Sequence, residues 1–176
     1  GRAEPYLALG ERLGRMAGQL LGAPPQVLKV DNWGLEEAFR APVSVAVLKG
    51  VLTPFLGEAV NYVNAERVAA GRGIEVVRST RSAPGDYPHL VSVTLSGGGR
   101  TVEIDGTLFR ERDPRVVRLG GYPLEFRPEG RLLFLENRDV PGVVGKIGTL
   151  LAAARVNIAD IHLARHPTEG EAEREA

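Results

Sequence analysis

Residues 90–105 read LVSVTLSGGGRTVEID, and this stretch sets the architecture of most of the chain. Before the three glycines, the apolar residues Val91 and Val93 alternate with Ser92 and Thr94. Alternation of this kind predicts a strand with one buried face, and consecutive glycines between two such runs predict a hairpin turn. We therefore expect two antiparallel strands that pack on a core by one face.

Further alternating runs lie on both sides of this hairpin, at 26–33, 74–77, 117–119 and 124–126. The strands near 90–127 are expected to form an antiparallel sheet. Such sheets commonly pack one face on the core and leave the other in water. Helices from the first part of the chain are expected to cover the buried face.

Four helices are expected before the hairpin. Residues 6–21 place apolar side chains at helical spacing, and a glycine and two prolines follow them. A nearly all-apolar helix is expected at 42–52, with its proline in the first turn. A separate helix is expected at 53–61, where a threonine cap precedes a proline, and another at 65–70 behind the cap residue Asn64.

The composition argues against several classes of partner. The 176 residues are 43% hydrophobic and 25% charged, as in ordinary globular proteins. The 22 basic residues balance the 22 acidic ones, whereas nucleic-acid and membrane surfaces select a basic excess. No apolar run approaches the roughly 20 residues that span a bilayer, and no signal peptide is recognisable. We expect a cytoplasmic protein without nucleic-acid or membrane partners. Its first residue is Gly rather than Met, which suggests either a fragment of a longer protein or a processed product.

Neither a metal site nor a catalytic set is predicted. The chain has no cysteine, which excludes disulfides and thiolate metal sites. His162 and His166 have four-residue spacing, but Pro167 follows them and no acidic partner is suitably placed. No serine has a plausible His–Asp pair, and no two carboxylates are positioned for acid–base chemistry.

Residues 137–148, NRDVPGVVGKIG, indicate a second structural unit. A strand expected at 131–136 runs into the Asp-x-Pro-Gly turn, and the apolar spacing of 143–154 predicts a helix. A second strand is expected at 156–163. The unit is therefore a βαβ element, for which a right-handed crossover is expected.

Four stretches carry a family resemblance: GEAVNYVNA at 57–65, RGIE at 72–75, GTLF at 106–109, and 139–158. They resemble the C-terminal region of long-form D-3-phosphoglycerate dehydrogenases, in which an allosteric substrate-binding domain precedes an ACT domain. The expected fold class is α+β, with a helix-covered antiparallel-sheet domain at 1–129 and a partial ACT domain, of ferredoxin-like βαβ type, at 130–176. A complete ACT domain is βαββαβ, so the missing half would leave a sheet edge unpaired.

The predicted effector site lies at the start of the second helix. Free backbone N–H groups at a helix N-terminus suit the carboxylate of an amino acid, and Asp139 is suited to its ammonium group. The resemblance implies L-serine, or a related amino acid, bound across a dimer interface. The alternative is that Asp139 only caps the helix and Asn157 only forms a turn. The predicted effector residues are Asn137, Asp139, Val140, Gly142, Asn157 and Ile158.

A second predicted site binds an anion in the first domain. Five arginines occur between residues 110 and 127, and guanidinium groups match phosphate and carboxylate oxygens. The resemblance implies a phosphorylated hydroxy acid or phosphate, bound by Arg115 and Arg127. The alternative is a solvated edge whose charges discourage strand aggregation.

The resemblance also implies a parent enzyme that uses NAD to oxidise 3-phosphoglycerate in serine biosynthesis. No cofactor is expected in this chain, because its glycines at 142, 145 and 148 are spaced GxxGxxG rather than GxGxxG. The chain is expected to be a regulatory, homo-oligomerising region. Two alternatives remain: a regulatory subunit of serine-dehydratase type, although the Ser-Ser-His-Thr run of that family is missing, and a purely structural assembly module.

Overall fold

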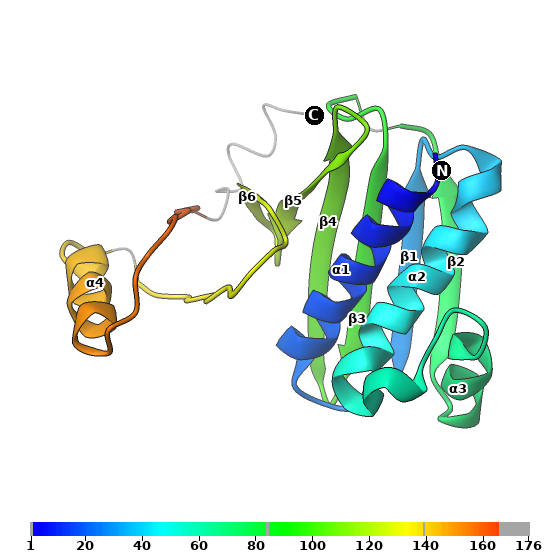
Figure 1. Cartoon of the computed structure of the whole chain (residues 1–176), viewed down its shortest axis with the longest axis horizontal. Helices are drawn as coiled ribbons and strands as arrows, with labels where there is room; N and C mark the ends of the chain where they lie inside the picture. Colours follow the sequence, from blue (N-terminus) through cyan, green and yellow to red (C-terminus); the bar gives the residue numbers. More distant parts are fainter. Residues whose placement is uncertain (1, 84, 139, 166–176) are drawn as a thin grey trace. The chain divides into compact units, whose positions relative to one another are not determined.

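A computed structural model of the chain describes residues 2–83, 85–138 and 140–165. The chain forms two compact units, Gly1–Pro128 and Glu129–Leu163 (Figure 1). The larger unit combines helices with one sheet, so the α+β class expected from the sequence is confirmed.

The sheet of the larger unit has six strands in the order β2-β1-β3-β4-β5-β6. The strands are β1 (Val27–Trp33), β2 (Glu75–Arg81), β3 (Leu90–Gly97), β4 (Arg100–Phe109), β5 (Asp113–Leu119) and β6 (Tyr122–Phe126). β1 and β2 are parallel because helices connect them, and the other neighbours are antiparallel. The predicted glycine hairpin is confirmed, since β3 and β4 pair from Val91 to the turn.

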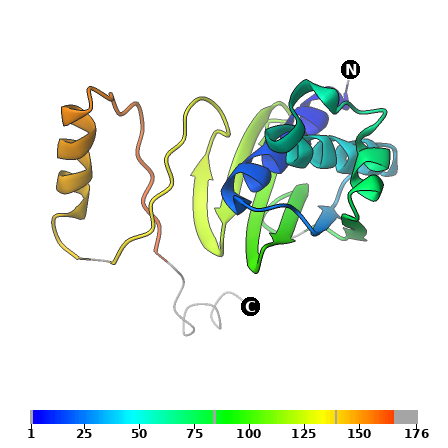
Figure 2. The same cartoon turned by 90° about the horizontal axis from the view of Figure 1, so that it is seen from below.

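Helices α1 (Glu4–Leu21) and α2 (Glu37–Leu56) cover one face of this sheet (Figures 1 and 2). The expected one-sided cover is therefore confirmed. Period-two alternation explains it, because Leu28 and Val30 of β1 are fully buried while Lys29 between them is not. The largest fully buried side chains come from both helices and the sheet, and include Leu9, Leu13, Leu21, Leu28, Leu48, Leu52, Leu95 and Ile104.

The two helices touch through their backbones. A Cβ on Gly14 would lie 2.0 Å from the carbonyl oxygen of Val47, and one on Gly18 would lie 2.6 Å from that of Val51. From the other side, a Cβ on Gly50 would lie 2.1 Å from the carbonyl oxygen of Glu11. Glycine is therefore required at these positions by close approach of the backbones, a feature also seen in helix pairs with small-xxx-small spacing.

The structure corrects the division of residues 42–61 into two helices. α2 is continuous, with Pro42 and Pro54 inside it, and a short 3₁₀ turn, η1 (Gly57–Ala59), follows. Thr53 is not an N-cap, because its hydroxyl donates a 2.7 Å hydrogen bond to the Lys49 carbonyl. Proline lacks one helical N–H and usually breaks a helix. Burial against α1 and the sheet outweighs that local cost.

The segment Glu37–Ala59 is, by length and composition, apolar enough to cross a membrane, so the expectation that no run approaches this length was wrong. Its apolar content has another explanation in the structure. Val43, Val47 and Val51 are fully buried, and all three contact α1. Core helices of folded domains have this same composition.

Asparagines order the turn before α3 (Ala65–Gly71). The Asn61 side chain accepts hydrogen bonds from the N–H groups of Val63 and Asn64, at 2.9 and 3.0 Å. Asn64 holds the N-cap position, but its side-chain oxygen accepts from the Asn61 N–H rather than from the helix. The predicted cap position is confirmed, but the predicted capping hydrogen bond is not formed. The side-chain oxygen of each asparagine instead accepts a hydrogen bond from the backbone N–H of the other.

The smaller unit contains the predicted helix, α4 (Val143–Ala153), but not the predicted strands. Residues 131–138 and 156–163 form no strand in the structure. The two parallel strands of a split βαβ unit are separated by another strand, and no described segment occupies that place. Without it, their backbone groups have no ladder partner. That the unit is half of an ACT domain stays a prediction.

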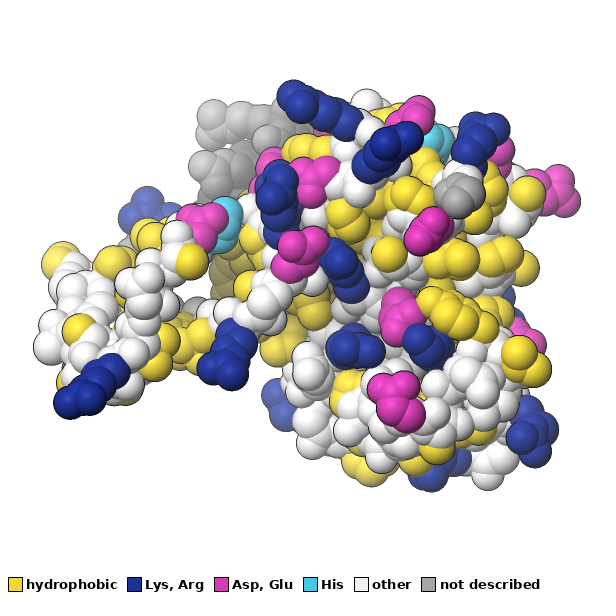
Figure 3. Space-filling view, in the orientation of Figure 1, with side chains coloured by type: hydrophobic (Ala, Val, Ile, Leu, Met, Phe, Trp, Pro, Cys, Tyr) yellow, Lys and Arg dark blue, Asp and Glu magenta, His cyan; other side chains and the backbone are white. Residues whose placement is uncertain are grey.

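Exposed apolar side chains are scattered over the surface of the smaller unit (Figure 3), and α4 buries none of its residues. Their exposed fractions range from 42% at Leu132 and Ile158 to 73% at Leu163. A unit of about 35 residues with this many exposed apolar side chains is suited to being covered by another chain or segment. The other members of this set are Leu133, Leu135, Val140, Val144, Leu150, Val156 and Ile161.

Candidate functional site

The helix-free face of the sheet carries a row of polar side chains aligned by strand register. Asp31 on β1 lies between Ser79 and Ser92, and Ser92 is opposite Asp105. Arg118 on β5 is opposite Asp105 and ends the row. The period of two that buries Leu28 and Val30 under the helices thus collects the polar residues of five strands on the other face.

The carboxylates in this row are well covered despite facing away from the helices. The side chain of Asp31 is 11% exposed, accepts a hydrogen bond from Ser79, and lies 3.3 Å from the Lys29 ammonium. Burial raises the pKa of Asp105, against the lowering effects of a hydrogen bond from Ser92 and of the Arg118 charge. Each carboxylate has a polar partner in the sheet, so the row is a satisfied network.

The two arginines predicted to bind an anion are brought together at the β5–β6 edge of this face. The guanidinium Nη2 atoms of Arg115 and Arg127 lie 2.8 and 3.1 Å from the same atom, Oδ2 of Asp113. Arg115 also lies 3.5 Å from a carboxylate oxygen of Glu125, and its guanidinium is 5.6 Å from the centre of the Phe109 ring. We call these five residues the arginine cluster.

Charge–charge contacts dominate the arginine cluster. Hydrogen bonds from Arg115, and then from Arg127, hold the pKa of Asp113 below its usual value. The Arg115 side chain is only 22% exposed, whereas that of Arg127 is 59% exposed. Two guanidinium groups therefore converge on one oxygen at the protein surface, and the carboxylates of Asp113 and Glu125 lie beside them in the part of the chain that the structure describes. This is the arrangement in which an incoming anion could replace a carboxylate.

Asp113, Glu125 and Phe109 were not predicted from the sequence. The alternation of β5 and β6 was the available signal, because Asp113 is two residues before Arg115 and so shares its face. Of the other three arginines, Arg118 pairs with Asp105 at 3.6 Å. Arg110 and Arg112 lie in the β4–β5 turn, where Arg110 has a φ of 50°.

The predicted effector residues lie around the N-terminus of α4. Gly142 is the N-cap residue, with φ of 89° and no side-chain capping bond. Val140 and Ile158 are 54% and 42% exposed, and Asn137 and Asn157 are exposed as well. Asp139 lies outside the described residues. Among the described residues, no side chain caps the N-terminus of α4, which is compatible with the geometry that the prediction requires.

The glycines at 142, 145 and 148 do not fit a dinucleotide. They stand at the N-cap and inside α4, whereas a dinucleotide site needs a glycine-rich turn directly after a strand. No group of three or more potential metal ligands occurs in the described part of the chain. His162 lies 3.0 Å from Asp160, and His166 is outside the described residues.

Comparison with known proteins identifies a family that has this domain. The family model of the D-3-phosphoglycerate dehydrogenase intervening domain matches residues 2–120, which span nearly the whole larger unit. The chain belongs to this intervening-domain family. This confirms the resemblance that the sequence indicated. Two members of the arginine cluster, Glu125 and Arg127, lie beyond the matched residues.

The alignments with individual relatives cover residues of both units of the chain. The chain is 35% identical to a D-3-phosphoglycerate dehydrogenase of Synechocystis over 97% of its own length. It is 30% identical to the Bacillus subtilis enzyme over 97% and 32% identical to the Archaeoglobus fulgidus enzyme over 92%. It spans only 31–33% of the length of these relatives. The matches support a regulatory role associated with D-3-phosphoglycerate dehydrogenase.

Proposed function

We propose that this chain is the regulatory, ligand-binding and oligomerising region of a cytoplasmic D-3-phosphoglycerate dehydrogenase in serine biosynthesis. The observation that carries the proposal is the convergence of Arg115 and Arg127 on Asp113 in a member of the intervening-domain family. NAD and the oxidation of 3-phosphoglycerate belong, in this proposal, to the rest of the parent enzyme. This chain supplies the ligand-binding sites. A ligand that binds one arrangement of the chain more tightly than another shifts the equilibrium toward that arrangement.

The arginine cluster is the proposed anion site. A phosphorylated hydroxy acid would take the place of Asp113 between the two guanidinium groups, and its phosphate would accept paired hydrogen bonds from Arg115. The Phe109 ring next to the Arg115 guanidinium helps to orient it. Asp113 then acts as a built-in competitor that is released to water when the anion binds.

We expect Arg115→Gln to weaken binding of 3-phosphoglycerate and inorganic phosphate by about tenfold, because it removes a charged donor from the site. We expect Asp113→Asn to strengthen binding several-fold, since it removes the competing carboxylate while it keeps the side-chain size. Calorimetric titration of the 176-residue chain at one fixed ionic strength measures both. Arg118→Gln is the matched control, because Arg118 pairs with Asp105 on the same face.

Two outcomes would count against this site. Binding that is unchanged in Arg115→Gln would place the anion elsewhere. Weaker binding in Asp113→Asn would mean that Asp113 positions the arginines instead of competing with the ligand. In that case the cluster is a structural ion network, as in the alternative drawn from the sequence.

The proposed second ligand is L-serine, bound at the N-terminus of α4. Its carboxylate would accept hydrogen bonds from the free N–H groups that follow Gly142, and Asp139 and Asn157 would hold the rest of the amino acid. The exposed apolar residues of the smaller unit support assembly of two chains around this site. A homo-oligomer is therefore part of the proposal.

Titration with L-serine, D-serine and glycine tests this second site. We expect saturable binding that is selective for L-serine and is lost in Asp139→Ala, because the ammonium group loses its charged partner. Asp160→Ala, an exposed carboxylate in the same unit, should bind as the wild type does. A dimeric sample that binds no serine would instead favour a purely structural assembly module.

A further inference from the structure

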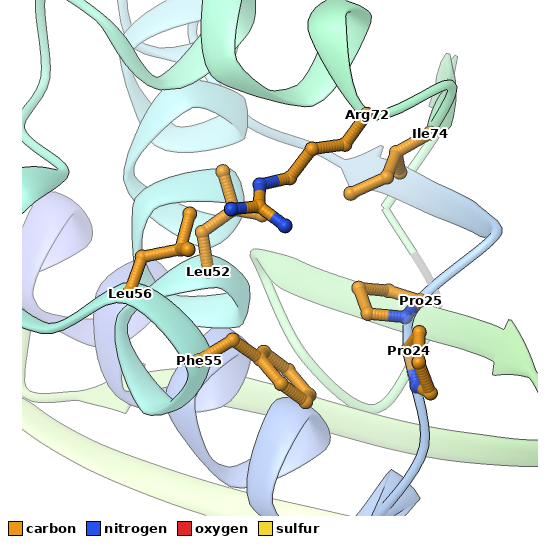
Figure 4. Close-up of a pocket in the computed structure, with 7 residues that line it drawn as sticks. All are labelled: Pro24, Pro25, Leu52, Phe55, Leu56, Arg72 and Ile74. Atoms are coloured by element: carbon orange, nitrogen blue, oxygen red, sulfur yellow. The ribbon is translucent and has the colours of Figure 1, made fainter.

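A cavity in the larger unit lies away from the arginine cluster. It is lined by Leu52, Phe55 and Leu56 from the end of α2, by Ile74 just before β2, and by the two prolines before β1 (Figure 4). Its volume is about 190 Å³. Ile74 leads into β2, at one edge of the sheet, whereas the arginine cluster occupies β5 and β6 at the other edge.

Backbone contacts hold the walls of this cavity in place. The turn residue Gly97 packs so closely on Pro24 that a Cβ would lie 2.2 Å from the Pro24 carbonyl oxygen. The Ile74 N–H donates a 3.0 Å hydrogen bond to the Ala69 carbonyl of α3, and the Glu75 N–H donates a 2.9 Å bond to Gln26. The cavity is therefore preformed, which lowers the entropic cost of binding.

One charged side chain, that of the exposed Arg72, lies at the rim of this cavity. It reaches from the end of α3 so that its guanidinium lies toward Leu52 and Leu56 (Figure 4). No carboxylate of the described residues pairs with this guanidinium. An apolar wall with a single cationic donor at its rim is complementary to a molecule with an apolar body and one anionic head.

The volume limits the size of such a molecule. An engineered cavity of about 150 Å³ holds benzene, so 190 Å³ accommodates a branched aliphatic or single-ring body of about six to eight heavy atoms. A phosphate alone would leave the apolar wall uncovered. A neutral hydrocarbon would offer the exposed guanidinium of Arg72 no charged partner in place of water.

We propose that this cavity binds a small apolar carboxylate, whose branched or aromatic body packs on Leu52, Phe55 and Leu56 and whose carboxylate pairs with Arg72. The ligand bridges the end of α2 and the α3–β2 connection. Binding therefore ties together two segments that are separated in the sequence. It also adds a ligand site to the larger unit that does not depend on the arginine cluster.

The test uses 4-methylvalerate as the probe, with its neutral amide and with acetate as comparison ligands. Two-dimensional amide NMR of the 176-residue chain follows shifts at Phe55, Arg72 and Ile74. We expect a Kd of about 1 mM for the acid, as is usual for so small a ligand. We expect binding about tenfold weaker for the amide, which lacks the negative charge, and for acetate, which lacks the branched apolar body.

Two variants locate the site. Arg72→Gln should weaken 4-methylvalerate binding about tenfold, while Arg67→Gln, an exposed arginine on α3, should leave it unchanged. Phe55→Ala should weaken it by removing one apolar wall without touching the fold, because Phe55 is 41% exposed. Equal binding of acid and amide, equal binding in Arg72→Gln, or no shifts at these residues would each overturn the proposal. None of these results changes the anion binding expected for Asp113→Asn, so the two proposals can fail independently.

Discussion

Replacing Gly14 by alanine should destabilise the larger unit by about 3 kcal/mol or more, the largest effect that we expect from a single methyl group. The added Cβ would lie 2.0 Å from the Val47 carbonyl oxygen and 2.9 Å from its carbonyl carbon. Neither atom belongs to a flexible side chain, so α1 and α2 must separate. Separation exposes core contacts such as those of Leu13, which is fully buried between the helix and the sheet.

Urea unfolding followed by circular dichroism measures this effect. Gly71→Ala is the matched control, because Gly71 is helical and a Cβ there would meet nothing within 4 Å. Alanine is favoured over glycine in helices by up to about 1 kcal/mol, so the control should be neutral or slightly stabilising. Gly50→Ala should behave like Gly14→Ala, because its Cβ would lie 2.1 Å from the Glu11 carbonyl oxygen. A Gly14→Ala protein as stable as the control would refute the close helix contact.

Removing the Glu11 carboxylate should cost about 2 kcal/mol, the second largest effect that we expect. One oxygen of Glu11 lies 2.6 Å from the Lys49 ammonium, and the other accepts a 2.5 Å hydrogen bond from the Tyr62 hydroxyl. Lys49 also lies 4.7 Å from the centre of the Tyr62 ring. Glu11→Ala leaves a mostly buried ammonium and a phenol unpaired, and releases the segment that carries Tyr62 from α1.

These contacts predict loss of stability at both ends of the pH range. Burial alone would raise the pKa of Glu11, but hydrogen bonds from Lys49 and Tyr62 outweigh burial and lower it. The carboxylate therefore stabilises the fold at pH values above its unfolded pKa near 4.5, and this contribution is lost as the pH falls through the lower folded value. Burial, and then the bond to Glu11, raise the pKa of Tyr62 from 10.0 to about 12. The stability linked to its proton is present below pH 10 and lost as the pH rises toward about 12.

Denaturation midpoints measured from acid to alkaline pH separate the two effects. Glu11→Gln should reduce the loss of stability at acid pH, and Tyr62→Phe should reduce the loss of stability at alkaline pH. Glu66→Ala is the control, because the pair of Glu66 with Arg78 is exposed and should contribute less than about 1 kcal/mol. An unchanged alkaline slope in Tyr62→Phe would show that the Glu11–Tyr62 hydrogen bond does not contribute to folding.

Local patterns were sufficient for much of the fold. Alternation around the three glycines predicted β3 and β4 and the face that they bury, because a half-buried strand needs a period of two. Helical spacing predicted α1 and α4 for the corresponding reason. The family resemblance implied Arg115 and Arg127 as anion-binding residues, and their role stays a prediction. No local pattern ranked Asp113 as the carboxylate that they share.

The errors arose where distant residues outweigh local preference. Pro42 and Pro54 are local signals for helix ends, yet α2 continues through both because burial on α1 and the sheet stabilises it. The strands expected on either side of α4 need hydrogen-bonding neighbours that residues 131–163 do not supply. Asn64 lacked its expected capping bond because Asn61, three residues away, took that oxygen.

The amino-acid sequence was therefore enough to establish the α+β class, the one-sided cover of the sheet and the family. These features depend on periodicity, composition and short motifs, which are local properties of the chain. Tertiary structure was needed to see that Gly14 and Gly50 bring two backbones into contact, that Asp113 lies between Arg115 and Arg127, and that Arg72 lines an apolar cavity. Each of these depends on distances between separate elements, and only packing sets such distances.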